Sequence, residues 1–184
     1  MKRISFKDGG GLHLTQAVLE GRKTMTRRAV IEQIEADAMV YAEGKSEFTR
    51  VKFEYILKHS PYKVGDVVAI QQAYKEVYKE LFGATITQTA LKRTAGWWNK
   101  MFVKAELMPH HIRITDVRVE RLQDISDEDC MREGIIRDDE PYSRYFFSLD
   151  SWYNNPRAAF AALIDKVSGR GTWDSNPLVF VYSF

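Results

Sequence analysis

One segment decides how the rest of this sequence is interpreted: Gly21-Arg22-Lys23-Thr24-Met25-Thr26-Arg27-Arg28. Four of its side chains are cationic, and crowded cations are tolerated most readily where an anion offsets their repulsion. Arginine suits a phosphate because its forked N–H donors match two oxygens at once. The segment therefore predicts a phosphate or nucleic-acid site, with a solvated strand face as the alternative. The four candidate ligands are Arg22, Lys23, Arg27 and Arg28.

The residues before this segment predict a short helix over about 15–20. Thr15 can serve as its N-cap, and Gly21 suits the left-handed residue beyond its end. In a regular strand after Gly21, alternate residues face opposite sides, so Lys23 and Thr26 would point apart. They meet only if the strand begins with a turn just after Gly21.

The composition is that of a soluble globular chain of 184 residues, a length that suits one domain with a sizeable core. Four Trp, nine Tyr and ten Phe favour a half-buried sheet, with base-stacking platforms as the alternative role for some of them. The net charge is only +2, so any attraction for phosphate must come from local clustering of cations.

The compartment is predicted from what the sequence lacks. A single cysteine, Cys130, excludes an internal disulfide and fits a reducing environment. No apolar run approaches the roughly 20 residues of a membrane span, and the first residues lack the apolar region of a signal peptide. We therefore expect a cytoplasmic protein without a membrane partner.

Periodicity and capping residues place the other elements. The segment 178–184 is apolar on both faces, which predicts a central strand. The apolar phase slips between Ile114 and Val117, as a β-bulge at Thr115–Asp116 would produce. Ser126 and Asn155 are good N-caps for two helices. Strands are expected near 51–57, 67–70, 102–107, 112–119 and 178–184, and helices near 15–20, 31–41, 127–133 and 156–168.

The remaining stretches predict additions to this framework. Residues 31–60 and 75–100 are expected to be insertions or elaborations, and 137–154 a loop. Several short strands with helices among them predict a single α+β domain over 1–184, built as a small mixed β-barrel with peripheral helices.

The spacing Gly-x-Lys-x-x-Thr-x-Arg, filled by Gly21, Lys23, Thr26 and Arg28, resembles the signature of the ASCH family. The similarity extends over most of the chain, and it is greatest to members from phages and prophages. The resemblance implies a PUA-like barrel and a role connected with RNA or modified nucleotides. It also includes Val64-Gly65-Asp66, Ile114-Thr115-Asp116-Val117, Leu122-Gln123-Asp124-Ile125-Ser126, Glu133-Gly134-Ile135, Gly171-Thr172-Trp173 and Asn176-Pro177.

The family includes small bacterial amidohydrolases that deacetylate acetylcytidine with a Lys, a Thr and a Glu. The resemblance places these roles on Lys23, Thr26 and Glu133. Neighbouring arginines would lower the pKa of Lys23 and make it a better base for the threonine hydroxyl. Glu133 lies in the last turn of its helix, where the dipole favours a protonated carboxyl that can donate to a leaving amine.

The chain departs from the phage-type pattern at Gln71-Gln72, where many members carry an Arg-Glu pair. Amides can still read base edges but carry no charge. Trp173 is a further candidate for stacking on a base, with a lid over one barrel end as the alternative. The Cys130 side chain is expected to be buried where its helix packs, and not to act as a nucleophile.

No metal and no cofactor are expected. His110 and His111 are adjacent and would point to opposite faces of a strand, so they cannot hold a metal together. Three functions stay open: a module that binds RNA or a nucleotide, an amidohydrolase of an N-acylated pyrimidine nucleoside, and a phage-derived interaction module without chemistry. Convergence of Lys23, Thr26 and Glu133 in one cleft would distinguish the enzyme.

Overall fold

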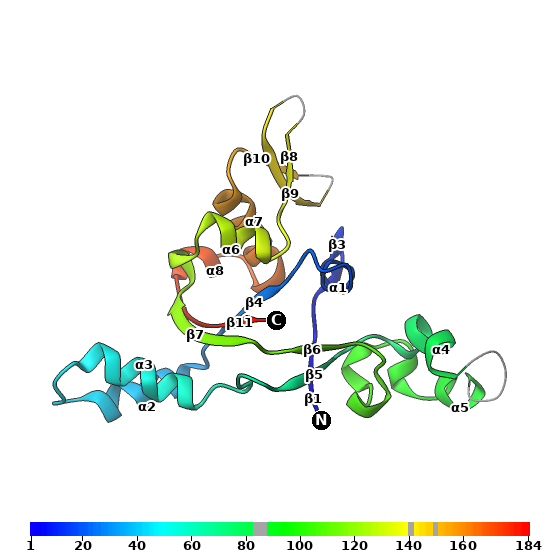
Figure 1. The fold of residues 1–184 in the computed structure, drawn as a ribbon, viewed down its shortest axis with the longest axis horizontal. Helices are drawn as coiled ribbons and strands as arrows, with labels where there is room; N and C mark the ends of the chain where they lie inside the picture. Colours follow the sequence, from blue (N-terminus) through cyan, green and yellow to red (C-terminus); the bar gives the residue numbers. More distant parts are fainter. Residues whose placement is uncertain (83–87, 140–141, 149–150) are drawn as a thin grey trace.

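The computed structural model describes residues 1–82, 88–139, 142–148 and 151–184 of a mixed α+β chain (Figure 1). At its centre is an antiparallel sheet of β4 (Met25–Ala29), β11 (Leu178–Ser183) and β7 (Asp116–Arg121), in the order β4-β11-β7. All six residues of β11 are buried, which confirms the predicted central strand. The basic segment thus continues into a strand of this sheet.

A second sheet has the order β1-β5-β6, built from β1 (Lys2–Ile4), β5 (Val67–Ile70) and β6 (His111–Arg113). Only Ile114 and Thr115 separate β6 from β7. The Ile114 N–H donates to Asp66 O at 2.9 Å, and the Thr115 N–H donates to Ser183 O at 2.9 Å. The phase slip predicted as a bulge is therefore the point where the chain passes from one sheet to the other.

The predicted barrel is not closed in the part of the chain that the structure describes. Its strands form separate small sheets, joined in sequence by the passage from β6 to β7. A third sheet contains β8 (Ile136–Asp138), β9 (Arg144–Ser148) and β10 (Ser151–Tyr153), and β2 (Asp8–Gly9) pairs with β3 (Leu12–His13). The prediction of an α+β fold is confirmed.

Four helices lie around the central sheet: α1 (Leu14–Leu19), α6 (Asp127–Arg132), α7 (Pro156–Ser168) and α8 (Thr172–Ser175). The predicted caps of two of them are confirmed, because Ser126 Oγ accepts from the Asp129 N–H and Asn155 Oδ1 from the Ala158 N–H. Thr15 is not the N-cap of α1. It lies inside the helix, and its N–H and hydroxyl both donate to Asp8.

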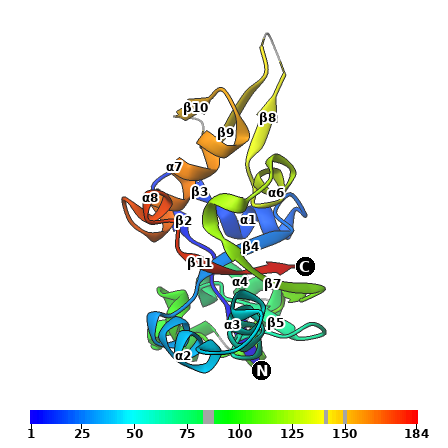
Figure 2. The same ribbon diagram turned by 90° about the vertical axis from the view of Figure 1, so that its left-hand side faces the viewer.

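The remaining elements extend away from this centre. α2 (Glu32–Ala42) and α3 (Phe48–Lys58) lie at one end of the molecule, and α4 (Tyr74–Phe82) and α5 (Gln88–Lys92) at the other (Figure 1). The β8–β10 sheet projects from a third side, as the turned view also shows (Figure 2). Short 3₁₀ turns complete the chain at η1 (Ala95–Trp97), η2 (Lys100–Phe102), η3 (Ala105–Leu107) and η4 (Leu122–Asp124).

Three predictions of local structure are wrong. The strand expected over 51–57 is helix α3, and its buried positions are Lys52 and Ile56, which lie one helical turn apart. The strand expected over 102–107 consists largely of the turns η2 and η3. The loop expected over 137–154 contains most of the third sheet. Residues 140–141 and 149–150 of that loop, and 83–87 of the predicted insertion, lie outside the described residues.

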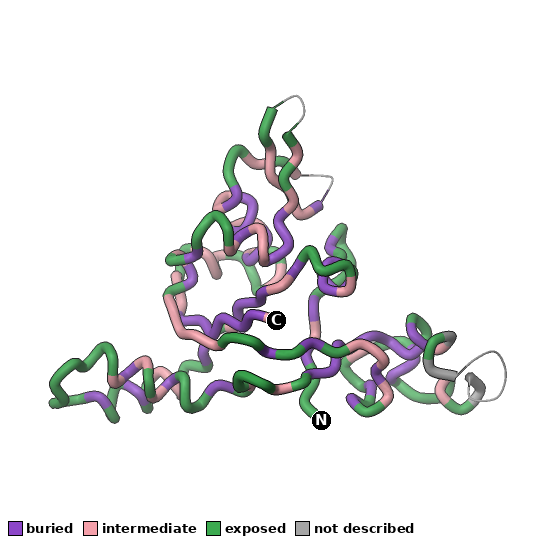
Figure 3. Tube along the Cα trace, viewed as in Figure 1, coloured by how far each residue is buried: buried purple, intermediate pink, exposed green. Residues whose placement is uncertain are grey.

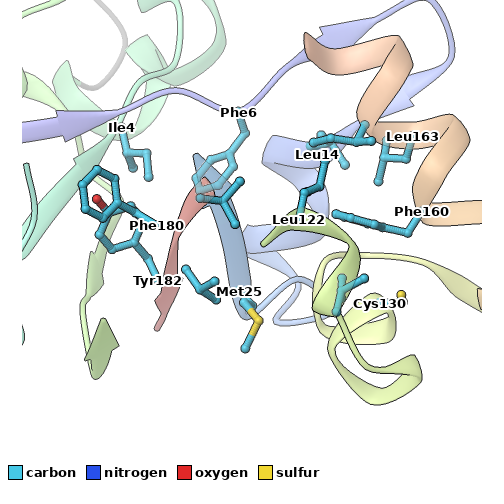
Figure 4. Close-up of a cluster of buried hydrophobic side chains, with 14 of the residues drawn as sticks. Ile4, Phe6, Leu14, Met25, Leu122, Cys130, Phe160, Leu163, Phe180 and Tyr182 are labelled. Carbon is cyan, nitrogen blue, oxygen red and sulfur yellow. The ribbon is translucent and has the colours of Figure 1, made fainter. Parts of the chain in front are cut away.

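The main core lies where the central sheet meets α1, α6 and α7. Buried positions are frequent there, whereas much of α2 and α3 is exposed (Figure 3). Figure 4 shows Phe6 beside the central strands, with Leu14 and Phe160 further along the same core. A smaller cluster under α4 shares β5 with the main core, because Val68 and Ala69 point to opposite faces of that strand.

No helix within the described part of the chain is long and apolar enough to cross a membrane.

Candidate active site

Lys23 and Glu133 are brought together by the backbone on either side of them. Gly21 has a φ of +72°, which ends α1 as predicted. The Lys23 N–H then donates to Ala17 O at 2.9 Å, and the Thr24 N–H donates to Arg132 O at 2.9 Å. The start of the basic segment is thereby fixed to the end of α6, where Glu133 is the C-cap residue.

The two side chains form a buried ion pair. Lys23 Nζ donates to Glu133 Oε2 at 2.5 Å and to the Glu133 carbonyl at 2.8 Å. Lys23 and Glu133 are each only 3% exposed. Gly134 follows in the left-handed region with a φ of +102°, and a Cβ built on it would lie 3.5 Å from Lys23 Cβ. The backbone after α6 can therefore pass close to Lys23.

Arg27 holds the other oxygen of the same carboxylate. Its Nη1 donates to Glu133 Oε1 at 3.1 Å, and its Nη2 donates to Glu120 Oε1 at 2.7 Å and Asp129 Oδ2 at 3.0 Å. Burial by itself lowers the pKa of Arg27, but Glu133, Glu120 and Asp129 outweigh it and raise the pKa. Both carboxylate oxygens of Glu133 thus accept hydrogen bonds from cations.

A cavity of about 290 Å³ lies next to this pair. Lys23, Thr26 and Glu133 all line it, so the three residues predicted for one cleft are in one cleft. The opposite wall is apolar and comes largely from α7, with Phe6 and Leu14 from the start of the chain. The α7 residues of this wall are Phe160, Leu163, Ile164 and Val167.

The place of β4 in its sheet explains how Lys23 and Thr26 share this cavity. β4 pairs with β11 alone among the described strands, so its other edge is free. Neighbouring residues of β4, including Thr26 and Arg27, line the cavity although they alternate between faces of the strand. The cavity therefore follows the free edge of β4, which residues from both faces can reach.

Thr26 presents a free hydroxyl to this space. The side chain is buried, with 4% of its surface exposed. Within the described residues no hydrogen bond to its Oγ1 is formed, whereas the hydroxyl of nearby Thr24 accepts from Arg132 Nε at 3.4 Å. Thr26 is therefore the threonine that is available to a ligand.

Burial lowers the pKa of Lys23 from its usual value near 10.5, and this effect exceeds the opposing attraction of Glu133. The charges of Arg28 and Arg27 lower the pKa further. At a given pH, the neutral form of Lys23 is thus more populated than that of an exposed lysine. A neutral amine has two N–H donors and one lone pair. With both hydrogens directed to Glu133, the lone pair is left for another proton.

The four cations of the basic segment do not form one exposed patch. Arg22 is exposed, pairs with Glu20 at 2.6 Å and lines a separate groove. Arg27 is enclosed by carboxylates, and Lys23 is bonded to Glu133. Arg28 lines the cavity and donates one hydrogen bond to Ser5 O. Of the four candidate phosphate ligands, Arg22 therefore lies apart, whereas the buried Lys23 and Arg27 and the partly exposed Arg28 line one cavity.

The other candidates lie away from the cavity. Trp173 packs edge-on against Phe160, with ring centroids 6.1 Å apart, and does not line the cavity. Gln71 Nε2 donates to Lys100 O at 2.9 Å, and Gln72 Oε1 pairs with His110 Nδ1 at 2.7 Å. The amides of Gln71 and Gln72 thus form internal hydrogen bonds, and neither residue lines the cavity.

Cys130 is fully buried in α6, as expected, and burial raises the pKa of its thiol to about 12. Among the described residues, no three His, Cys, Asp or Glu side chains are grouped as ligands for a metal ion.

Sequence reasoning missed the carboxylates that surround Arg27. Neither Asp129 nor Glu120 was singled out from the sequence. The available signal was the alternation of Arg118 and Glu120, which places both on one face of β7. Arg118 Nε donates to Glu120 Oε2 at 2.9 Å, and Arg118 also pairs with Asp129.

No protein-family model matches the chain, and neither a curated protein nor a solved structure gives a match.

Proposed function

We propose that this protein is an amidohydrolase that removes the acyl group from an N-acylated pyrimidine nucleoside. The observation that carries the proposal is the shared cavity of Lys23, Thr26 and Glu133. It supplies an uncommitted hydroxyl, a lysine whose pKa is lowered, and a carboxylate that orients this lysine. Acetylcytidine is the first substrate to test, because the family resemblance implies it.

In the first step Thr26 Oγ1 attacks the acyl carbon while the hydroxyl proton passes to the neutral amine of Lys23. A C–O bond forms, and the carbonyl oxygen becomes an oxyanion. Glu133 holds Lys23 through two hydrogen bonds, so the lone pair of the amine keeps its direction. Arg27 compensates the charge of Glu133 when Lys23 is neutral.

In the second step the oxyanion collapses and the C–N bond breaks. The leaving nitrogen takes the proton that Lys23 received from Thr26, and the acyl group remains on Thr26 as an ester. Water then adds to the ester with Lys23 again as base, which releases the carboxylic acid and restores the hydroxyl. We assign the proton transfer to Lys23 and not to Glu133, because both oxygens of Glu133 already accept hydrogen bonds.

The apolar wall agrees with a small planar substrate. Phe6 and Phe160 line the cavity from opposite ends of the sequence, and the volume of about 290 Å³ is at the lower limit for ligand pockets. Such a space suits a single base or nucleoside better than a stretch of polynucleotide. The wall would exclude water from the acyl group during attack.

A PUA-like fold is part of the same proposal. The strands follow one another as β1-β5-β6 and then, through the bend at Ile114, as β7-β11-β4. A small barrel that is open between β1 and β4 would have its strands in this order. Contacts near that gap include the hydrogen bond from Arg28 to Ser5 O and the packing of Arg28 over Phe6.

Binding of RNA through the basic segment stays a prediction. Its support is weaker than for the enzyme, because Lys23 and Arg27 are committed to buried carboxylates. An interaction module without chemistry also stays a prediction, and no contact of the described residues favours it.

The test compares two threonines that lie two residues apart. Purified protein is incubated with acetylcytidine, and release of cytidine is followed by chromatography. We expect turnover by the wild type, loss of turnover in Thr26→Ala and Lys23→Ala, and near wild-type turnover in Thr24→Ala. Absence of turnover of any acylated pyrimidine nucleoside by the folded wild type would contradict the proposal.

The pH dependence of this turnover provides a second readout. Lys23 is inactive when protonated, so kcat should rise with pH as the lysine loses its proton and then reach a plateau. Because burial lowers the pKa of Lys23, the midpoint of this rise should lie below the usual lysine value near 10.5. A rate that is constant over the accessible pH range would exclude Lys23 as the base.

A further inference from the structure

Among the described residues, Lys7 and Arg28 are the cations of the cavity lining without an anionic partner, and Lys7 donates instead to the carbonyls of Lys166 and Val167. Lys23 pairs with Glu133, and Arg27 pairs with three carboxylates. None of the ion pairs within the described residues includes Arg28. Its one hydrogen bond goes from Nη2 to the neutral carbonyl of Ser5.

The guanidinium is nevertheless held in place, and the residue is only partly exposed. It lies over the ring of Phe6, with 5.8 Å between Cζ and the ring centroid, while Lys23 Nζ lies 6.0 Å from the same centroid. Burial lowers the pKa of Arg28, and Glu133 acts against this effect. A partly buried cation without an anion carries a desolvation cost, and an anion in the cavity would offset that cost.

The position of Arg28 on β4 indicates which anion this is. Thr26 and Arg28 lie opposite Tyr182 and Phe180 of β11, so they face the same side of the sheet. Two residues of a strand span about 6–7 Å, a distance that an arginine side chain can cover. Negative charge that develops next to Thr26 Oγ1 is therefore within reach of the unused guanidinium donors, Nε and Nη1.

We propose that Arg28 is a catalytic residue that donates hydrogen bonds to the oxyanion formed when Thr26 attacks the acyl carbon. This inference rests on the proposed amidohydrolase function and adds the group that stabilises its transition state. The fixed cation needs no reorganisation as charge develops, which is the condition for effective electrostatic stabilisation. A neutral acyl substrate gains little from Arg28 before attack, so the effect belongs to kcat.

The first experiment compares Arg28→Gln, Arg28→Lys and the matched control Arg22→Gln in turnover of acetylcytidine. Loss of one oxyanion donor typically lowers kcat by about 10²–10³-fold. We expect a loss of this size in Arg28→Gln with little change in KM, a smaller loss in Arg28→Lys, and no change in Arg22→Gln. Thermal unfolding shows whether each variant is folded.

A second experiment measures the tetrahedral state without turnover. The boron of phenylboronic acid accepts an electron pair from Thr26 Oγ1 while the hydroxyl proton passes to Lys23, which forms a tetrahedral boronate anion. Boron NMR detects the adduct. Arg28→Gln should weaken the binding of phenylboronic acid by at least tenfold, whereas binding of the planar, uncharged analogue benzamide should not change.

The outcomes separate the two proposals. A folded Arg28→Gln variant with wild-type kcat, or with a raised KM and unchanged kcat, overturns the role of Arg28 and leaves the amidohydrolase in place. A wild type that neither turns over acylated nucleosides nor forms the boronate adduct overturns both. A wild-type adduct that Arg28→Gln weakens supports the role of Arg28 even where acetylcytidine is not the substrate.

Discussion

Glu133 is the residue on which the charges of the site depend. Its carboxylate accepts hydrogen bonds from both Lys23 and Arg27. All three residues are buried, so water could not take the place of the carboxylate beside either cation. Removal of one member of a buried ion pair leaves the other charges uncompensated and costs about 3–5 kcal/mol. We therefore expect Glu133→Gln to lower the free energy of unfolding by this amount, as measured by urea denaturation.

The matched control for this change is Glu20→Gln. Glu20 also pairs with an arginine of the basic segment, Arg22, but both side chains are more than 40% exposed. Exposed ion pairs contribute little because water and salt screen them. The midpoint of unfolding should therefore stay where it is in the wild type. If both substitutions lowered the free energy of unfolding equally, the charge of Glu133 would contribute no more to stability than that of an exposed carboxylate.

The family resemblance predicted that Lys23, Thr26 and Glu133 share one cleft, but not how the charges around them are neutralised. Lys23 and Thr26 came from the motif spacing and Glu133 from the family resemblance, and backbone hydrogen bonds from Lys23 to Ala17 and from Thr24 to Arg132 bring the three residues to one cavity. The role of Arg27 could not be predicted, since its carboxylates lie 93 to 106 positions further along the chain. A charge run looks the same whether phosphate or buried carboxylates neutralise it.

At the scale of elements, α7 matters most to the site because one of its faces is the apolar wall of the cavity. Asn155 begins this helix by accepting a hydrogen bond from the Ala158 N–H at 2.8 Å. Substitution of an N-cap by alanine costs about 1 kcal/mol. We expect Asn155→Ala to lower the free energy of unfolding by about that much, whereas Asn154→Ala, one position outside the cap, should have no effect. The reverse order would argue against the cap.

Readable ends helped to predict two helices, whereas the apolar pattern alone misassigned a third. α6 and α7 have readable ends, with Ser126 and Asn155 as caps. α3 was predicted as a strand because Val51, Phe53 and Tyr55 alternate with other residues. Its buried side instead includes Lys52, whose stem packs inside while Nζ pairs with Glu35 at 2.9 Å. The apolar pattern therefore pointed to the wrong period.

At the scale of the whole molecule, Cys130 reports on global unfolding because it is the sole cysteine and lies in the main core. Burial raises the pKa of its thiol from near 9.0 to about 12, so at neutral pH the folded chain holds almost no thiolate. A thiol reagent should modify it only in molecules that have unfolded. The rate of modification should rise in parallel with unfolding in urea, and rapid labelling of the native protein would contradict this.

The raised pKa of Cys130 also makes the free energy of unfolding depend on pH in the alkaline range. Between pH 9 and about 12 the unfolded chain loses the thiol proton while the folded chain keeps it. Tyr182 acts in the same direction, because burial raises the pKa of its hydroxyl from near 10.0 to about 12. The free energy of unfolding should therefore decrease as the pH rises through this range.

The α+β class could be predicted from the sequence, whereas the division of the strands into small sheets could not. The pairing of strands is set by contacts between distant segments. In the sequence, a phase slip such as that at Ile114 looks the same whether the strand bulges or the chain passes to another sheet. The β8–β10 sheet was missed because its strands are only three to five residues long, too short to show a clear alternation.

β11 also determines when during synthesis the chain can acquire its site. This strand lies between β4 and β7, and both are translated long before residues 178–183. Until these residues leave the ribosome, the strand that carries Thr26 has no partner, and its exposed N–H and C=O groups are open to pairing with other chains. A nascent polypeptide therefore contains every residue of the proposed triad well before it contains a working site, and that interval is when it is most exposed to aggregation.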